Sequence, residues 1–166
     1  DHLIGLVDRE LYPEDRFPAG QWEYMRFYEE NFDAARAEME VDAAATTRVL
    51  FRAGNPKSAG MPSPTSMVRH NGGWFRGAER PPDMPLDDRV LSAAEHEVYA
   101  TALARNGFFG PNSWYMNHAD NAEFAAAAVN DGVLEMPALF VGARYDVTCE
   151  TMTSRLAEPM RDYCRD

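Results

Sequence analysis

The stretch QWEYMRFYEEN, residues 21–31, is the part of the sequence that most clearly indicates how the chain folds. Its apolar residues recur every three or four positions, so Trp22, Met25 and Tyr28 share one face of an α-helix. Tyr24 and Phe27 overlap with that face. The stretch therefore predicts an amphipathic helix whose buried side carries aromatic rings.

The surrounding segments extend this helical pattern. Residues 32–42 and 43–53 are rich in alanine and predict two more helices, so a helical hairpin or small bundle is expected up to about Ala53. Upstream, apolar residues from Leu3 to Leu11 predict a short helix or turn that stops at Tyr12-Pro13, followed by a loop over residues 14–20.

The middle of the chain changes character. Residues 54–88 are rich in proline and glycine and predict irregular structure. A helix is expected to begin at Ser92, where Glu95 completes a capping box, and to end at Gly107. Pro111 then suits the first turn of a helix bearing Trp114 and Tyr115, and Asp120 suits the cap of another helix that runs through Val129.

The run PALFVG, residues 137–142, is the one convincing strand in the sequence. A single strand leaves its backbone groups unpaired, so this strand is expected to belong to a sheet whose other members are absent from the sequence. Asp146 follows it and is expected to lie at the carboxyl end of the strand, placed to orient a histidine. Residues 150–164 predict a helix that Pro159 kinks or shortens.

Composition narrows the range of functions. The net charge of −11 disfavours nucleic acid and anionic membranes as partners. We expect one soluble, cytoplasmic unit, because the sequence shows no spanning run and no signal peptide. The two cysteines suggest neither a disulfide framework nor a metal site. His96-Glu97 lacks the second histidine of a zinc motif, since Ala100 stands at that position.

Tyr24 and Tyr115 are the candidate residues with the clearest chemical use. Two phenols that converge on one point can donate two hydrogen bonds to an oxygen that is gaining negative charge, as happens when a strained cyclic ether opens. An epoxide is therefore the first substrate to consider. Each tyrosine could instead be a buried helix residue whose hydroxyl reaches the surface, and Asp146 could simply cap a turn or the next helix.

Three segments together resemble a known family: YPED with PAGQWEY (residues 12–15 and 18–24), GFFGPNSWYMN (107–117), and PALFVG with RYD (137–142 and 144–146). They are similar to the epoxide hydrolases of the α/β-hydrolase fold, of the soluble or fungal type. The resemblance implies a mainly α chain: a linker from the core over residues 1–20, a helical cap domain over residues 20–135, and one strand-helix unit of the hydrolase core over residues 136–166.

The family's reaction sets the expected role of each site residue. An aspartate attacks the epoxide carbon while two cap tyrosines, matching Tyr24 and Tyr115, hold the ring oxygen. A histidine oriented by the acid, matching Asp146, then activates the water that releases a diol. Trp22, Met25 and Trp114 are expected to bind the substrate in an apolar cavity. No metal and no organic cofactor is implied.

The resemblance also implies that parts of the machinery lie outside this sequence. The nucleophile segment would precede Asp1, and the catalytic histidine would follow the acid, whereas all four histidines here precede it. We therefore expect this chain alone to be inactive and its partners to be an epoxide and the missing core segments. A dehalogenase or ester hydrolase of the same fold and a non-catalytic helical binding module remain the alternatives.

Overall fold

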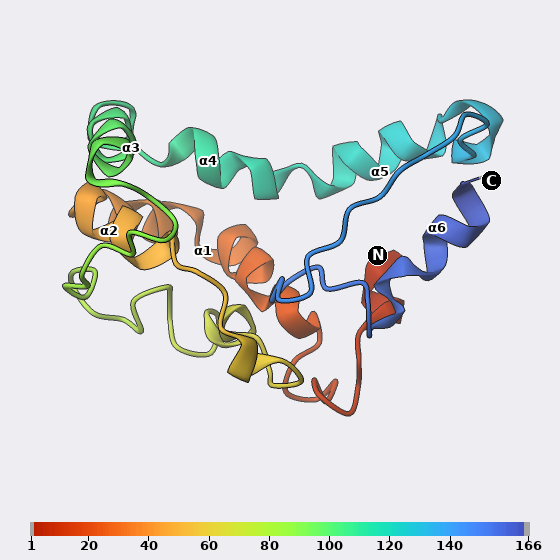
Figure 1. Cartoon of the computed structure of the whole chain (residues 1–166), viewed down its shortest axis with the longest axis horizontal. Helices are drawn as coiled ribbons and strands as arrows, with labels where there is room; N and C mark the ends of the chain where they lie inside the picture. Colours follow the sequence, from red (N-terminus) through yellow and green to blue (C-terminus); the bar gives the residue numbers. More distant parts are fainter. Residues whose placement is uncertain (1, 165–166) are drawn as a thin grey trace.

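A computed structural model describes residues 2–164, which are mainly helical as expected (Figure 1). The α-helices are α1 (Glu23–Glu40), α2 (Ala43–Leu50), α3 (Ala93–Asn106), α4 (Phe109–Ser113), α5 (His118–Ala126) and α6 (Glu158–Tyr163). The shorter 3-10 helices are η1 (His2–Leu6), η2 (Gly20–Trp22), η3 (Pro56–Ser58), η4 (Pro64–Met67), η5 (Trp114–Met116), η6 (Val129–Gly132) and η7 (Arg155–Ala157). None of the helices in this part of the chain has the length and apolarity needed to cross a membrane.

The central helix α1 joins two segments that the sequence predicts as separate helices. Its backbone leaves helical geometry only at Asn31, with φ −140° and ψ 40°, so the predicted boundary between residues 31 and 32 is a kink rather than a break. The buried face carries Tyr24, Tyr28, Ala35 and Met39, spaced as the amphipathic pattern requires. This face is the centre of the hydrophobic core.

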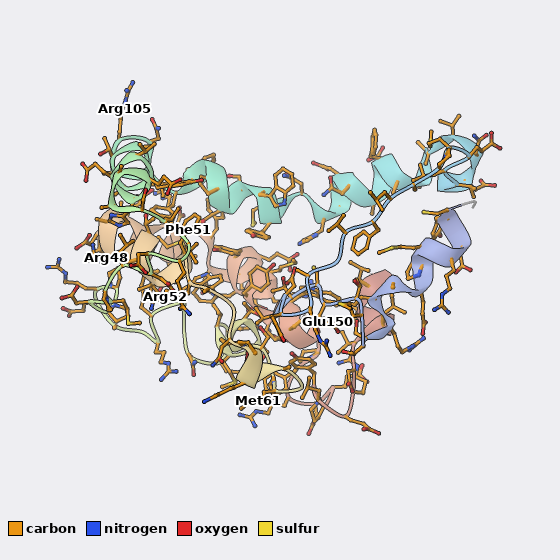
Figure 2. The ribbon with its side chains drawn as sticks, viewed as in Figure 1. Arg48, Phe51, Arg52, Met61, Arg105 and Glu150 are labelled. Atoms are coloured by element: carbon orange, nitrogen blue, oxygen red, sulfur yellow. The ribbon has the colours of Figure 1, made fainter. Side chains whose placement is uncertain are left out.

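Helix α2 makes stabilising contacts at both ends. The Asp42 carboxylate caps its first turn by accepting from the Ala45 N–H at 2.9 Å. Arg48 and Phe51 lie toward its other end (Figure 2). There Phe51 packs on Tyr99 of α3, with ring centroids 4.9 Å apart, and Arg48 donates to the Met84 carbonyl at 2.9 Å. These contacts hold α2, α3 and the loop before α3 together.

Helix α3 begins and ends where the sequence predicts. The Ser92 hydroxyl accepts from the Glu95 N–H, and the Glu95 carboxylate accepts from the Ser92 N–H, which completes the capping box. Gly107 closes the helix with φ 72°. The prediction that residues 54–88 are irregular is also confirmed, since only η3 and η4 interrupt that loop.

The C-terminal third corrects several expectations. Residues 137–142 form no strand, and Leu139 and Val141 are 92% and 83% exposed. No neighbouring strand exists among the described residues, so the extended backbone has no ladder to join. The one bridge in residues 2–164 pairs Leu134 with Cys164, through the Leu134 N–H and the Tyr163 carbonyl at 2.7 Å.

Three helix ends also differ from the sequence-based expectation. Pro111 lies in the first turn of α4 as expected, but that helix ends at Ser113, so Trp114 and Tyr115 belong to η5. Helix α5 begins at His118 without a side-chain cap and ends at Ala126 rather than Val129; Asp120 lies in its first turn, where a carboxylate interacts favourably with the helix dipole. Pro159 lies in the first turn of α6, where its missing N–H costs nothing, and so begins that helix instead of kinking it.

Candidate functional site

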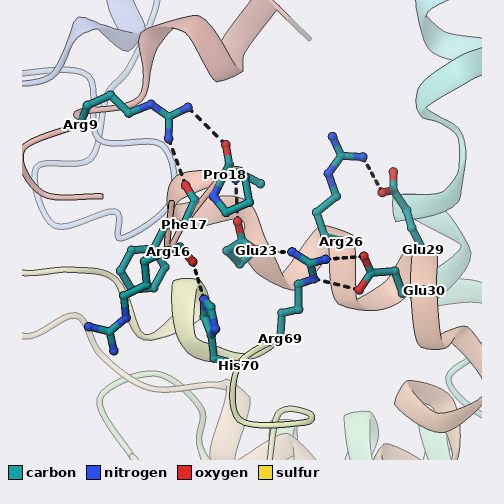
Figure 3. A network of polar contacts seen from close by, with 11 residues as sticks. Arg9, Arg16, Phe17, Pro18, Glu23, Arg26, Glu29, Glu30, Arg69 and His70 are labelled. Atoms are coloured by element: carbon teal, nitrogen blue, oxygen red, sulfur yellow. Dashed lines mark hydrogen bonds and ion pairs between the residues drawn. The ribbon is translucent and has the colours of Figure 1, made fainter. Parts of the chain in front are cut away.

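The start of α1 is fixed by a buried carboxylate. Glu23 is fully buried, and it accepts a hydrogen bond from the Ala19 N–H at 2.6 Å. Arg69, from the loop after η4, donates to Glu23 at 3.2 Å and to Glu30 at 2.6 Å (Figure 3). A paired and hydrogen-bonded charge can remain ionised in the interior. The network therefore holds the first two turns of α1, from which Tyr24 projects.

Tyr24 and Tyr115 meet across two elements that are distant in the sequence. Tyr24 comes from α1 and is 7% exposed, whereas Tyr115 comes from η5 and is half-buried. Their ring centroids lie 5.3 Å apart at an interplanar angle of 80°. The structure thus brings the two phenols side by side.

Two further rings complete this aromatic cluster, and the sequence does not single out either for the site. Tyr28 stacks on Tyr115, with centroids 5.0 Å apart and planes 3° from parallel. Trp74 lies 5.7 Å from Tyr24 and 6.2 Å from Tyr28. Tyr28 could have been found from the helical period, one turn after Tyr24. Trp74 lies in a glycine-rich loop with no period, so no signal pointed to it.

Burial keeps Tyr24 and Tyr28 protonated. Burial, and then the neighbouring Tyr115, raise the pKa of Tyr24 well above the ordinary value of about 10. Burial likewise raises the pKa of Tyr28, with Tyr115 adding to the rise and the Trp74 indole opposing it. The Tyr24 hydroxyl is therefore a hydrogen-bond donor throughout the range in which proteins are stable.

Asp146 lies in a tight turn rather than at the end of a strand. Its Oδ1 accepts from the Thr148 N–H, the Thr148 hydroxyl and the Cys149 N–H, each at 2.9 Å. Partial burial would raise its pKa, but these hydrogen bonds outweigh burial and hold the pKa below the usual range. Asp146 is therefore an ionised carboxylate that stabilises its own turn.

This turn approaches the start of α1. The Gln21 amide reaches the Thr148 carbonyl at 3.5 Å, and Cys149 lies close enough to Tyr24 to raise the pKa of that phenol. A cavity of about 190 Å³ separates the turn from η1 and from residues 58–64, and Asp146 lines it. Neither Tyr24 nor Tyr115 lines this cavity, so the Asp146 carboxylate and the two phenols do not face one common cavity.

The expected substrate-binding residues are found in different surroundings. Trp22 is buried in the core, and Met25 packs against the core from a half-buried position. Trp114 is 78% exposed, although it adjoins Tyr115. None of these three side chains lines the cavity beside Asp146. His118 lies 3.7 Å from Glu29, and residues 2–164 contain no group of three metal-binding side chains.

Comparison with known proteins shows a distant similarity to an epoxide hydrolase. The chain is 26% identical over 135 residues to the bifunctional epoxide hydrolase 2 of Rattus norvegicus. The match covers 81% of this chain and 23% of the rat protein, so the chain spans about a quarter of the length of that relative. No family model matches the chain. The similarity supports at most a distant relationship to epoxide hydrolases and the α/β-hydrolase fold.

Proposed function

We propose that this chain is the helical cap of an epoxide hydrolase, in which Tyr24 and Tyr115 donate hydrogen bonds to the epoxide oxygen. The observation that carries the proposal is the pairing of the two rings at 5.3 Å from elements distant in the sequence. The distant similarity to a rat epoxide hydrolase points to the same chemistry.

The environment of the phenol pair suits this task. Opening an epoxide expels an alkoxide, which is costly in a dry pocket unless donors are already in place. The raised pKa of Tyr24 means that the phenol carries its proton when the oxygen needs it. Because the two rings are in contact at 5.3 Å, an incoming ring oxygen would accept a hydrogen bond from each phenol.

The nucleophile and the water-activating histidine would come from segments of an α/β-hydrolase core. A compact protein of 166 residues has an accessible surface of roughly 8,300 Å². This chain exposes 11313 Å², an excess of roughly 3,000 Å² that is comparable to a large protein interface. Much of its exposed apolar surface follows α4, including Leu139, Phe140 and Val141. That excess supports a role as part of a larger assembly.

The test combines the chain with a complementing α/β-hydrolase core fragment and measures diol formation from styrene oxide. Tyr24→Phe and Tyr115→Phe should each lower the rate of the mixture about 100-fold, because each removes one donor to the developing alkoxide. Tyr99→Phe is the matched control, since Tyr99 lies on α3 against Phe51 and outside the cluster. It should retain full activity.

Other outcomes identify the alternatives. Halide release from a haloalkane without epoxide turnover would favour a dehalogenase, and ester cleavage alone would favour an ester hydrolase. Binding of an epoxide-mimicking urea without any turnover in the mixture would favour a non-catalytic module. Equal activity of Tyr24→Phe, Tyr115→Phe and Tyr99→Phe would contradict the proposed role of the phenol pair.

A further inference from the structure

The angle between the Tyr24 and Tyr115 rings is set by side chains that lie behind them. Tyr115 comes from the short element η5, whose neighbour Trp114 is largely exposed, so the local chain provides little to hold the ring. Its firm contact is the parallel stack with Tyr28 at 5.0 Å. Such ring pairs contribute about 0.5–1.5 kcal/mol beyond the area they bury. Tyr28 is 3% exposed and cannot turn away to water.

Trp74, from the loop between η4 and α3, packs against the same aromatic cluster. It contacts both Tyr24 and Tyr28 edge-on or tilted, and its indole N–H is buried with no hydrogen-bond partner of normal geometry. Trp74 lies in an irregular loop, which would ordinarily be mobile. The loop therefore needs an anchor near this residue.

Glu38 is that anchor. Its carboxylate accepts from the Trp74 N–H at 3.0 Å and from the Phe75 N–H at 3.5 Å. The approach is possible because Gly73 has φ 135° and no side chain, and a Cβ there would meet Glu38 Oε2 at 2.5 Å. Glu38 lies on α1, after Tyr24 and Tyr28. One helix therefore carries these two tyrosines and also the carboxylate that holds the Trp74 loop in place.

We propose that Tyr28, Trp74 and Glu38 form a positioning cradle that fixes the ring of Tyr115 against Tyr24, so that both hydroxyls can address one ligand oxygen. That the two hydroxyls bind a ligand oxygen rests on the proposed function, whereas the positioning of the Tyr115 ring by its neighbours does not depend on it. None of the three needs to touch the ligand oxygen. They act through Tyr24 and Tyr115, and a positional error of about 1 Å in such a pair is enough to lose most of its effect.

The first readout is the ring dynamics of Tyr115, measured by NMR on the chain carrying labelled tyrosine. In Tyr28→Leu the stack is lost, and the flip rate of the Tyr115 ring should rise at least about tenfold, since packing alone restrains it. Tyr28→Phe keeps the stacking ring and should restore the slow rate. Phe27→Leu is the matched control, because Phe27 is a buried aromatic residue of α1 with no ring pair to Tyr115 among the described contacts.

The second readout is the affinity of the same variants for N,N′-diphenylurea, whose carbonyl oxygen stands in for the ring oxygen. Tyr28→Leu and Glu38→Ala should each weaken binding about tenfold, while Tyr28→Phe, Glu38→Gln and Phe27→Leu should stay within about twofold. An unchanged flip rate in Tyr28→Leu, or equal effects of Tyr28→Leu and Phe27→Leu, would overturn the cradle. Altered ring dynamics with no urea binding by the unmodified chain would support the cradle and count against the proposed function.

Discussion

The aromatic residues of α1 and those that follow α4 meet opposite surroundings. Tyr24, Phe27 and Tyr28 are buried against the loop around Trp74 and against Tyr115. After Tyr115 the chain runs along α5 and returns in an extended segment (Figure 1). Phe124 and Phe140, which lie on these two parts of the chain, are exposed. The first region is stabilised by contacts within the chain, whereas the second region carries apolar surface that contacts within the chain do not cover.

The comparison shows that apolar pattern and burial are separate properties. Residues 137–142 have the composition of a buried strand, yet they lack a partner among the described residues. Residues 22–28 have a partner face and are buried. An apolar run thus indicates that burial is required, and the surrounding structure decides whether it occurs.

Hydrogen exchange should show the largest contrast between the two regions. Residues 137–142 donate no backbone hydrogen bond to any described residue, whereas the amides within α1 are bonded along the helix. Amides of α1 after its first turn should exchange at least about 1,000-fold more slowly than those of residues 137–142. Mass spectrometry or NMR on the isolated chain would measure this difference.

Slow exchange of residues 137–142 in the isolated chain would contradict this contrast, because it would mean that their backbone amides are hydrogen-bonded in solution. A dilution series serves as the control. Protection that disappears on dilution would identify self-association through the open strand edges.

Core substitutions should show the next largest effect. Met39 is almost fully buried, so Met39→Ala should lower the free energy of unfolding by about 3 kcal/mol through lost contacts and a cavity. Leu139→Ala removes an exposed side chain and should change it by less than about 0.5 kcal/mol. Denaturant titration measures both values. Comparable losses from the two variants would show that residues 137–142 are buried in solution.

The ion pairs offer a smaller test of the same contrast. Arg69→Ala leaves the fully buried Glu23 carboxylate without its cation and should cost about 2 kcal/mol, toward the low end because water reaches Arg69. Arg155→Ala removes an exposed pair with Glu158 near the C-terminus and should leave the free energy of unfolding nearly unchanged. Thermal and denaturant unfolding measure the stability of both variants. An equal loss from both would show that the buried pair of Arg69 and Glu23 stabilises the fold no more than an exposed pair does.

The smallest expected effect is a pH dependence in the cradle. Burial raises the pKa of Glu38 above its ordinary value of 4.5, so its contribution to stability is present below that value and is lost as pH rises through the folded pKa. Glu38→Gln should therefore gain in unfolding free energy relative to the unmodified chain between pH 4 and pH 7. Denaturation at a series of pH values measures this gain.

Asp87→Asn is the opposite-sign control. Hydrogen bonds from Arg89 lower the pKa of Asp87, so its contribution is present above the unfolded pKa and is lost as pH falls. This variant should lose stability at neutral pH relative to acid. A gain in stability with pH in Asp87→Asn would contradict the lowered pKa of Asp87, and no gain in Glu38→Gln would contradict the raised pKa of Glu38.

Local features of the fold were predictable from the sequence. The capping box at Ser92, the terminator at Gly107, the irregular loop before α3 and the amphipathic face of α1 all appear as expected. Each depends on hydrogen bonds or periodicity within about four residues, which the sequence contains directly. The end of one helical pattern at residue 31 was also visible, although the structure bridges it with a kink at Asn31.

The candidate site was predictable only in part. Tyr24 and Tyr115 could be named from their segments, but their ring geometry could not, because it depends on Tyr28 and on Trp74. Trp74 is anchored by Glu38, which lies 36 positions away in the sequence. The turn around Asp146 was an alternative to the expected strand end, and the hydrogen bonds of Thr148 and Cys149 favour the turn.

The sequence by itself determined the helical character of the chain, the boundaries set by caps and glycines, and the acidic surface. The tertiary structure alone decided which rings meet, which carboxylate anchors the loop behind them, and which apolar segments remain exposed. The physical reason is range: capping and amphipathicity act between neighbours along the chain, whereas ring packing and strand pairing require surfaces that only the folded arrangement brings together.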